Sequence, residues 1–495
     1  TNDRSDCYGG SVENRQRICV EIVAGIRAAV GPDFILIYRL SMLDLVEGGS
    51  NWEEIVQLAK AVEAAGATLI NTGIGWHEAR IPTIVTRVPR AGFSWITKKL
   101  KNEVSLPLCT TNRINMPAVA EQLLADGVAD MVSMARPFLA DADFVAKAAS
   151  GREDEINTCI ACNQACLDHS FKWKRASCLV NPRAGHETKL NFLPAKQPRR
   201  FAVVGAGPAG LAAACYAGQR GHEVTLFDSA NEIGGQFNLA KRIPGKEEFT
   251  ETLRYFGRQI ELRRVTLRLS TEATAQSLQD GGFDEIIVAT GVDPRRLTLP
   301  GIDHASVASY SDIILGRREA GDRVAVIGAG GIGFDVSEFL THPQSPATDP
   351  ALFCAEWGVD PTAEARGGLV APRPTPSPRE VFLLQRSDGK PGRNLGKTSG
   401  WAHRASLAHK GVHLIGAVQY ERIDDHGLHI TVGGQPRLLE VDTVVICAGQ
   451  QSRRGLAGEL DALGVTNHLI GGAKLAAELD AKRAIREAAE LVARL

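Results

Sequence analysis

Two hydrophobic periodicities alternate along the first third of the chain. Four apolar runs of strand length occur there, at residues 34–40, 68–72, 106–111 and 130–135. Stretches that are apolar at helical spacing lie between these runs. The alternation predicts four successive units in which a β-strand is followed by a helix.

Four such units are half of a (β/α)₈ barrel, which typically has eight strands and about 250 residues. A sheet of four strands would leave two unpaired edges. We therefore expect an α/β fold in which residues 1–150 form the C-terminal half of a barrel, with the other half earlier in the same full-length chain. Polar residues follow the strands, at the ends where a barrel carries its active site: Arg39, His77, Arg113, Ala135-Arg136.

A different pattern begins near residue 199, where a strand leads into a glycine-rich turn and a helix. The turn reads Gly205-Ala206-Gly207-Pro208-Ala209-Gly210. Its glycines allow a tight turn and close approach of a pyrophosphate to the helix N-terminus. Asp228 ends the next strand, where an acid can bind a ribose hydroxyl. The segment with Gly235 and Gln236 resembles that of two-dinucleotide flavoprotein reductases, in which FAD occupies this first site.

A second turn of the same kind reads Gly328-Ala329-Gly330-Gly331-Ile332-Gly333. The strand after it ends at Gln385-Arg386, which offers a cation instead of an acid and so favours NADPH over NADH. More than fifty residues separate the turn from Arg386, so the Pro-rich stretch 343–378 is expected to loop out within this second domain. Gly291 lies in a turn that resembles those joining the two nucleotide domains of such reductases, and Gly472 lies in one placed like their late FAD-contacting turn, so both are expected to contact the cofactor.

These motifs predict two Rossmann-like dinucleotide-binding domains. The FAD domain is expected at residues 196–315 and 436–495, with the NADPH domain inserted at 316–435. Between the barrel segment and the FAD domain lies a stretch with little periodicity, residues 151–195.

That stretch holds four cysteines with the spacing C-x2-C-x3-C-x11-C: Cys159, Cys162, Cys166 and Cys178. Four thiolates suit either zinc or an iron–sulfur cluster. A structural zinc site would more often show two separated C-x2-C pairs, so the spacing favours a 4Fe–4S cluster, with zinc as the alternative. Four unligated thiols in such a hydrophilic stretch would be exposed and reactive.

Composition adds few constraints. The chain has 495 residues, 44% of them hydrophobic, and a formal net charge of −1. The length predicts several domains, and the charge gives no argument for binding nucleic acid or an anionic membrane. No apolar run reaches the ~18–20 residues of a spanning helix. The six remaining cysteines are scattered, as expected of buried thiols in a reducing compartment, so we expect a cytoplasmic protein.

The N-terminal stretch NDRSDCYGGSVENR resembles the old yellow enzyme signature. With INTGIGWHEARIPT, the cysteine set and GGIGFD, the chain resembles the bacterial 2,4-dienoyl-CoA reductase family. The resemblance implies a barrel with FMN, a dienoyl-CoA substrate, and electron flow from NADPH through FAD and the cluster to FMN. It also implies that His77 is the active-site histidine, working with a tyrosine acid, and that Arg39, Arg113, Ala135 and Arg136 contact FMN.

Three alternatives remain at this stage. The chain could be a related enone or bile-acid-type reductase, a trimethylamine dehydrogenase-like enzyme, or an electron-transfer module completed by a separate half-barrel chain. The family's tyrosine would lie before Thr1. The 495 residues alone are therefore expected to pass electrons from NADPH to acceptors without reducing a dienoyl thioester.

Overall fold

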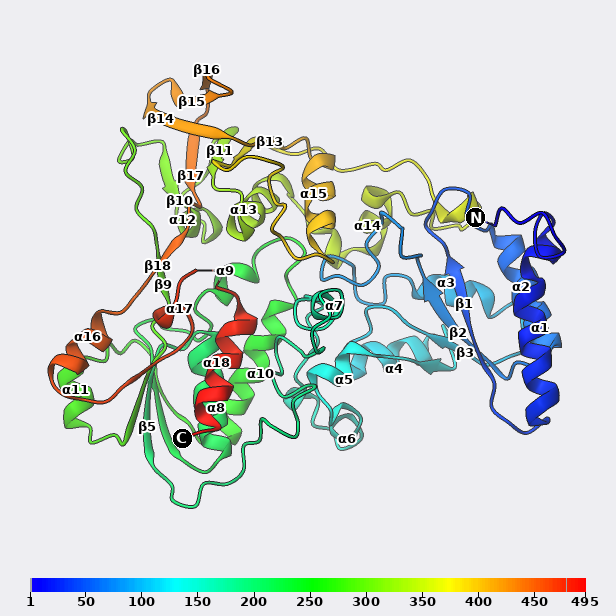
Figure 1. Cartoon of the computed structure of the whole chain (residues 1–495), viewed down its shortest axis with the longest axis horizontal. Helices are drawn as coiled ribbons and strands as arrows, with labels where there is room; N and C mark the ends of the chain where they lie inside the picture. The colour runs from blue at the N-terminus through cyan, green and yellow to red at the C-terminus, as the bar shows by residue number, and fades with distance from the viewer. Residues whose placement is uncertain (1, 478) are drawn as a thin grey trace. The chain divides into compact units, whose positions relative to one another are not determined.

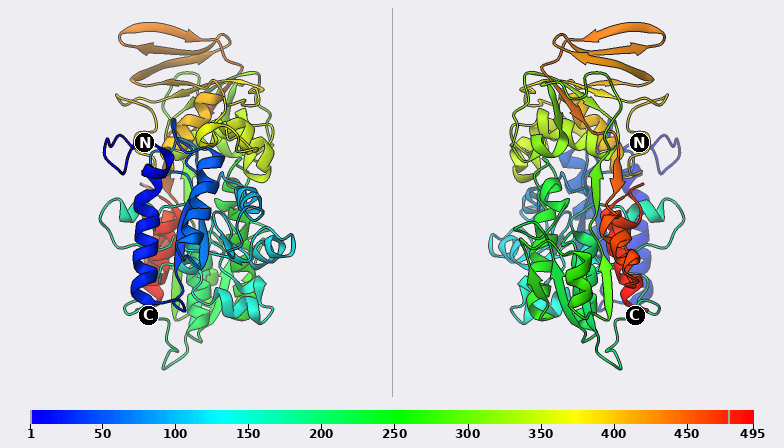
Figure 2. Two further views of the ribbon diagram at one scale, coloured as in Figure 1. Left: turned by 90° about the vertical axis from the view of Figure 1, so that its right-hand side faces the viewer. Right: turned by 90° about the vertical axis from the view of Figure 1, so that its left-hand side faces the viewer.

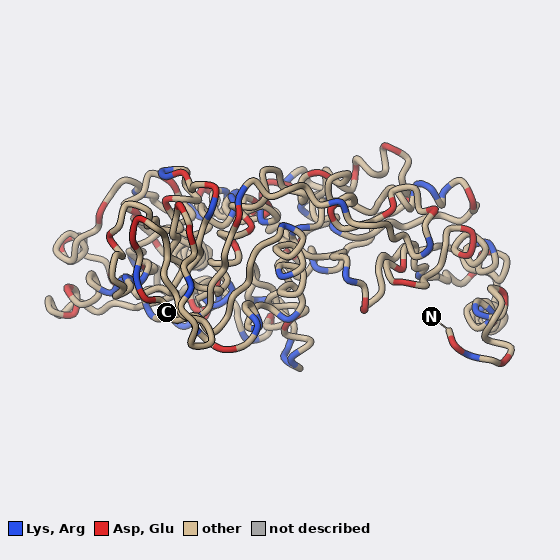
Figure 3. Tube along the Cα trace, turned by 90° about the horizontal axis from the view of Figure 1, so that it is seen from above, with Lys and Arg blue, Asp and Glu red and all other residues tan. Residues whose placement is uncertain are grey.

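The computed structural model describes residues 2–477 and 479–495, which form two compact units (Figure 1). The barrel unit is the chain up to Ala135 together with Ser345–Thr375, and the nucleotide unit is Arg136–Gln344 with Pro376–Leu495. Acidic and basic residues are interspersed along both (Figure 3). In the described ranges, no helix combines the length and apolar character needed to cross a bilayer.

The barrel unit contains one parallel sheet with the strand order β1-β2-β3-β4. The strands are β1 (Ile37–Leu43), β2 (Leu69–Ile74), β3 (Leu108–Thr110) and β4 (Met131–Val132). The helices are α1 (Val12–Val30), α2 (Trp52–Ala64), α3 (Ser94–Leu100) and α4 (Pro117–Ala125). The predicted alternation of strands and helices is therefore confirmed, although β1 begins three residues later than the apolar run suggested.

An apolar face of this unit is exposed. Within the described part of the chain, β1 pairs only with β2. Ile18, Ile22 and Ile26 recur every four residues along the outer side of α1, and Ile35 and Ile37 near the start of β1 are also exposed. Another strand and helix would cover such side chains in a closed barrel.

The stretch predicted to loop out of the second nucleotide domain instead belongs to the barrel unit. It contains η2 (Pro346–Thr348), α14 (Pro350–Trp357) and η3 (Arg366–Gly368). Its composition, rich in Pro and Ala, concealed a short helix with fully buried Phe353, whose ring packs edge to face on Phe93 at 5.9 Å between centroids. The expectation of a free loop was wrong because this helix has an apolar partner surface.

Backbone and charged contacts attach the same segment to the loop after β1. The Leu45 amide donates to the Gly367 carbonyl and the Gly367 amide donates to the Ser50 carbonyl, both at 2.9 Å. Arg366 forms an ion pair with Glu54 at 3.0 Å. Residues 345–375 thus form part of the folded barrel unit.

The nucleotide unit contains two five-stranded parallel sheets. The first has the order β19-β8-β5-β6-β7 and the second the order β10-β17-β11-β12-β13. The strands of the first are β5 (Arg200–Val204), β6 (Glu223–Phe227), β7 (Thr266–Arg268), β8 (Glu285–Val288) and β19 (His468–Leu469). The strands of the second are β10 (Val307–Ser309), β11 (Arg323–Ile327), β12 (Glu380–Leu384), β13 (His413–Ile415) and β17 (Thr443–Ile446).

Both sheets are covered on two sides. One core of the first sheet is shared with α8 (Pro208–Gln219), α10 (Phe249–Leu262) and α18 (Ala481–Val492), and the other with α11 (Ala275–Asp280) and α16 (Gly455–Ala462). The second sheet packs on α12 (Tyr310–Ile314), α13 (Gly331–Thr341) and α15 (Gly400–His409). Its other side packs on a three-stranded meander, drawn in orange in Figure 2: β14 (Val418–Asp424), β15 (Gly427–Val432) and β16 (Gln435–Leu439).

The sheets correct the predicted domain boundaries. Strands β10 and β17 were expected in the FAD domain, but both pair within the second sheet, with Val324 of β11 opposite Thr443 of β17. The chain passes between the two sheets through an antiparallel pair, β9 (Val292–Pro294) and β18 (Gln450–Ser452). Residues 136–150, predicted to belong to the barrel, form α5 (Arg136–Ala140) and α6 (Phe144–Ala149) of the nucleotide unit.

The packing of α14 makes a testable prediction. The substitution Phe353→Ala should lower the free energy of unfolding of the barrel unit by about 3–5 kcal/mol, because it leaves a cavity against Phe93. Urea denaturation followed by tryptophan fluorescence measures this change. Val370→Ala in the same segment, whose side chain is 39% exposed, is the control and should change stability by less than about 0.5 kcal/mol. Equal small effects of both substitutions would mean that the segment is a free loop.

Candidate functional site

The first glycine-rich turn has a shape that only glycine permits. Gly205 has φ +108°, and a Cβ there would lie 2.4 Å from the Ala289 carbonyl oxygen. A Cβ on Gly210 would lie 1.8 Å from the Gly205 oxygen. Beside Gly207, the N-cap of α8, the space is open. The turn therefore presents a free helix N-terminus, as a bound pyrophosphate requires.

The other predicted FAD-site residues gather around this turn. Asp228 accepts from the Ala206 amide at 2.6 Å, which holds its carboxylate at the end of β6. A Cβ on Gly235 would lie 3.1 Å from the Gly207 Cα. Pro208 and Ala209 begin α8, and Ala209 faces Gly471, the residue before Gly472.

Two further residues complete this cluster. A Cβ on Gly472 would lie 3.0 Å from the backbone of Gly291, so the two late turns adjoin each other. The Gln236 side chain hydrogen-bonds the Tyr310 hydroxyl, which also accepts from Gln450 at 3.2 Å. Sequence reasoning missed Tyr310, because its contact with Gln236 depends on how α12 packs.

The second glycine-rich turn borders a large cavity. This cavity has a volume of about 1780 Å³ and is lined, among others, by Gly328, Gly330, Gly331 and Arg386. Gly330 and Gly331 have open space where a Cβ would be, at the N-terminus of α13. Gly333 lies outside this lining, and a Cβ there would come within 1.8 Å of the Gly328 oxygen. The structure thus brings the turn and the predicted cation to one site.

Several basic residues of the same cavity were not predicted. They are Lys172, Lys174, Arg295, Lys482, Arg483 and Arg486. They come from the cysteine segment, from the end of β9 and from α18, so only tertiary structure assembles them. Their positive charge suits a ligand that carries several phosphates.

The four predicted cysteine ligands surround a second, smaller cavity of the nucleotide unit. Cys159, Cys162, Cys166 and Cys178 all line it. Two non-glycine residues between them, Ala161 and Asn163, have positive φ (+51° and +61°), a conformation that bends the chain tightly there.

The thiols are close enough to influence one another. Burial, together with the neighbouring Cys159 and Cys166, raises the pKa of Cys178 to about 12. Burial and the neighbouring cysteines likewise raise the pKa of Cys162. Among the described residues, no three His, Cys, Asp or Glu side chains are placed to hold a metal ion together. What the structure shows of the four thiols is that they border one shared cavity.

Two residues of the cysteine segment, Ser177 and Cys178, line both cavities. They form part of the wall between the nucleotide cavity and the cysteine cavity. Cys178 thus borders the nucleotide cavity, which the second glycine-rich turn also lines.

Arg136, a predicted FMN contact, lies beside the cysteines. Its guanidinium donates to the Asn163 side-chain oxygen and lines the cysteine cavity. Burial raises the pKa of Cys166, while the Leu167 amide and the Arg136 charge oppose that rise. Contact of Arg136 with a flavin phosphate stays a prediction.

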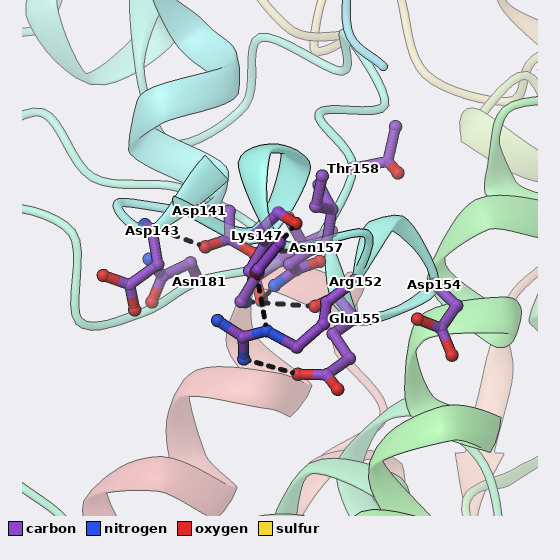
Figure 4. A network of polar contacts seen from close by, with 12 residues as sticks. Asp141, Asp143, Lys147, Arg152, Asp154, Glu155, Asn157, Thr158 and Asn181 are labelled. Atoms are coloured by element: carbon purple, nitrogen blue, oxygen red, sulfur yellow. Dashed lines mark hydrogen bonds and ion pairs between the residues drawn. The ribbon is translucent and has the colours of Figure 1, made fainter. Parts of the chain in front are cut away.

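A buried polar network holds both ends of the cysteine segment (Figure 4). The Asp141 carboxylate accepts from the Asn157 amide at 2.8 Å and from Lys147 Nζ at 2.6 Å. The Asn157 side chain donates to the Val180 carbonyl at 2.8 Å. The side chain of Asn157 therefore ties a residue before the first cysteine to one after the last, and the Asp141 carboxylate holds Asn157 in place.

The other predicted FMN-site residues lie in the barrel unit. His77 is exposed in a turn directly after β2. Arg39 is exposed on β1 and donates to Asn71 at 3.1 Å, and Ala135 is exposed after β4. Arg113 is buried, and its Nε donates to the Val88 carbonyl at 2.9 Å. Their contacts with FMN stay predictions.

The turn that carries His77 is anchored by its neighbour. Trp76 Nε1 donates to the Asp44 carboxylate at 2.7 Å. Asp44 is buried and also accepts from the Ser50 amide at 2.7 Å. The anchor fixes the backbone beside His77 while the imidazole remains exposed.

The two parts of the chain match two flavoenzyme families. Residues 1–155 match the NADH:flavin oxidoreductase / NADH oxidase family, and residues 199–477 match the pyridine nucleotide-disulphide oxidoreductase family. These matches confirm the predicted fold class and support binding of FMN, of FAD and of a pyridine nucleotide.

Individual relatives align over most of the chain. A metal reductase of Desulforamulus reducens is 32% identical over 478 residues, 95% of this chain and 71% of the relative. A cinnamate reductase of Clostridium sporogenes is 30% identical over 70% of this chain and 54% of its own length. The structure of a 2-naphthoyl-CoA reductase has a TM-score of 0.88 at 32% identity, covering 100% of this chain and 70% of that one. The chain thus spans about half the length of the cinnamate reductase.

The Asp141 network gives a second prediction. Asp141→Asn removes the partner of Lys147 in a largely buried ion pair, so it should lower the free energy of unfolding by about 3 kcal/mol. Urea denaturation measures this loss. Iron analysis should show a parallel loss if the tied segment binds a cluster. Asp143→Asn is the control, because Asp143 is exposed and only its backbone amide contacts Asp141. Equal stability of the two variants would contradict the role given to the network.

Proposed function

Because the chain belongs to the pyridine nucleotide-disulphide oxidoreductase family and carries an NADH:flavin oxidoreductase domain before it, we propose that the protein, with the other half of its barrel in place, reduces 2,4-dienoyl-CoA to enoyl-CoA with NADPH, a reaction of fatty acid β-oxidation. The observation that carries the proposal is the wall shared by the two cavities of the nucleotide unit, in which Cys178 takes part. It gives electrons that enter at the nucleotide site a way toward the cysteines.

The residues of the nucleotide unit divide the electron input between two sites. The open N-terminus of α8 and the carboxylate of Asp228 suit the pyrophosphate and ribose of FAD. The turn at Gly328–Gly333 suits the pyrophosphate of NADPH, and Arg386 suits its 2′-phosphate. The basic lining of the cavity supports the same assignment.

Cys159, Cys162, Cys166 and Cys178 would hold a 4Fe–4S cluster, which supplies one-electron transfer when bound. Four thiols around one buried cavity fit such a group. The C-x2-C-x3-C-x11-C spacing favours this group over a single zinc ion, for which two separated C-x2-C pairs are more usual. The ties from Asn157 to Asp141 and Val180 would keep these ligands in place.

The barrel unit would carry FMN and the substrate. Arg113 follows β3, on the face that binds ligands in barrels. Arg39, predicted to end its strand, lies within β1, because that strand extends to Leu43. His77 projects from an anchored turn on that face, where an imidazole can hold and move the proton that must reach the substrate carbon chain. The similarity to a CoA-thioester reductase supports a thioester substrate.

A second candidate function is electron transfer to an external acceptor. It is favoured by the alignment with a metal reductase, which covers 95% of the chain. In that case the nucleotide unit would still take electrons from NADPH through FAD, and His77 would have no part in the reaction.

His77 separates these two functions. In the holoenzyme, His77→Ala should reduce NADPH-dependent turnover of a 2,4-dienoyl-CoA by about 10²–10⁴-fold, because a proton-transfer group is lost. Reduction of ferricyanide by NADPH should not change. Glu78→Gln, an exposed neighbour in the same turn, is the matched control. A holoenzyme with a complete barrel that reduces ferric complexes but no dienoyl thioester would refute the proposed reaction and favour the second function.

The cysteine site is tested by metal content. Cys166→Ser should reduce bound iron and sulfide from about four of each per chain to well below one. Reduction of the FAD by NADPH should be retained, since the nucleotide turns are untouched. Cys7→Ser, at an exposed cysteine outside the cluster set, is the control and should keep full iron. If the unaltered protein contains zinc and no iron, the four cysteines bind zinc instead of an iron–sulfur cluster.

A further inference from the structure

A residue that lines the nucleotide cavity carries a buried hydroxyl with no hydrogen-bond partner in the described part of the chain. It is Tyr420, which lies on β14 and packs against the apolar core between the second sheet and the meander.

Arg386 and Tyr420 approach the same part of this cavity. Arg386 follows β12, and the chain of β14 begins next to it: the Val418 amide donates to the Gln385 carbonyl at 3.0 Å, and the Ala417 amide donates to the Ser387 carbonyl at 3.2 Å. The guanidinium is near enough to act on the phenol, since it opposes the rise that burial causes in the pKa of Tyr420. Both side chains line the cavity.

A buried hydroxyl without a partner costs free energy that a ligand oxygen would return. Because burial raises the pKa of Tyr420, its phenol keeps its proton and acts as a donor near neutral pH. A donor next to an arginine, at the strand end where dinucleotide sites hold the adenosine ribose, suits an anion on that ribose. An uncharged ribose hydroxyl would leave Arg386 without a counter-charge.

We propose that Tyr420 is a further specificity-determining residue, whose hydroxyl donates to the 2′-phosphate of NADPH alongside Arg386. The inference rests on the NADPH-dependent function proposed above and adds a residue from outside the glycine-rich fingerprint. The meander β14–β16 then has a part in cofactor selection, in addition to covering the second sheet.

The test uses two small probes that differ by the phosphate in question, adenosine 2′,5′-bisphosphate and 5′-AMP, with binding measured by calorimetry on the holoenzyme. Tyr420→Phe should weaken binding of the bisphosphate by roughly 10- to 100-fold, as expected for loss of a hydrogen bond to a charged group. Binding of 5′-AMP should change by less than about twofold. Tyr255→Phe, at a buried tyrosine of α10 in the first core, is the matched control and should change neither.

The outcomes separate the inference from the function it rests on. If the unaltered protein binds the two probes equally, both the NADPH assignment and the role of Tyr420 are overturned. If it prefers the bisphosphate and Tyr420→Phe keeps that preference, only the inference is overturned. In the expected case, Arg386→Ala and Tyr420→Phe together cost less than the product of their separate losses, because both act on one phosphate.

Discussion

The buried carboxylate of Asp141 is the interaction on which the cysteine site depends. Its side chain is only 6% exposed, so its charge must be paired inside the protein. Lys147 supplies the charge and the Asn157 amide supplies a hydrogen bond. Asn157 in turn holds Val180. Between these two tie points the chain has little regular structure beyond α7 (Leu167–Ser170), so few ladder hydrogen bonds define where the cysteines lie.

The hydrogen bond between Asn157 and Val180 also determines which cavities the cysteines border. Because Val180 is held next to Asn157, the chain returns through Ser177 and Cys178, the two residues that border both cavities. Arg136 meets the same segment from the start of α5 and is held by Asn163. Its charge therefore acts on the cysteine cavity, although its position after the fourth barrel strand had suggested a flavin phosphate.

What the sequence predicted well was local. The glycine spacings at Gly205–Gly210 and Gly328–Gly333 reflect contacts within one turn, where a Cβ would strike backbone, so the residue pattern is sufficient to recognise them. The cysteine spacing is a local pattern too, and the cluster that it favours stays a prediction. What the sequence could not predict depends on packing between distant segments. Tyr420 lines the cavity because β14 starts beside Gln385, and Phe353 is buried because α14 lies against Phe93.

The segment 345–375 changes how the chain is connected. It leaves the nucleotide unit after α13 and returns before β12, yet it folds in the barrel unit. The chain therefore passes between the two units three times: after Ala135, after Gln344 and after Thr375. Between the second and third of these crossings, the attachment of Gly367 to Leu45 and Ser50 ties the segment to the loop that also contains Asp44, the anchor of Trp76. The segment inserted between α13 and β12 and the turn that carries His77 therefore depend on the same loop of the barrel unit, although more than 260 residues separate them in the sequence.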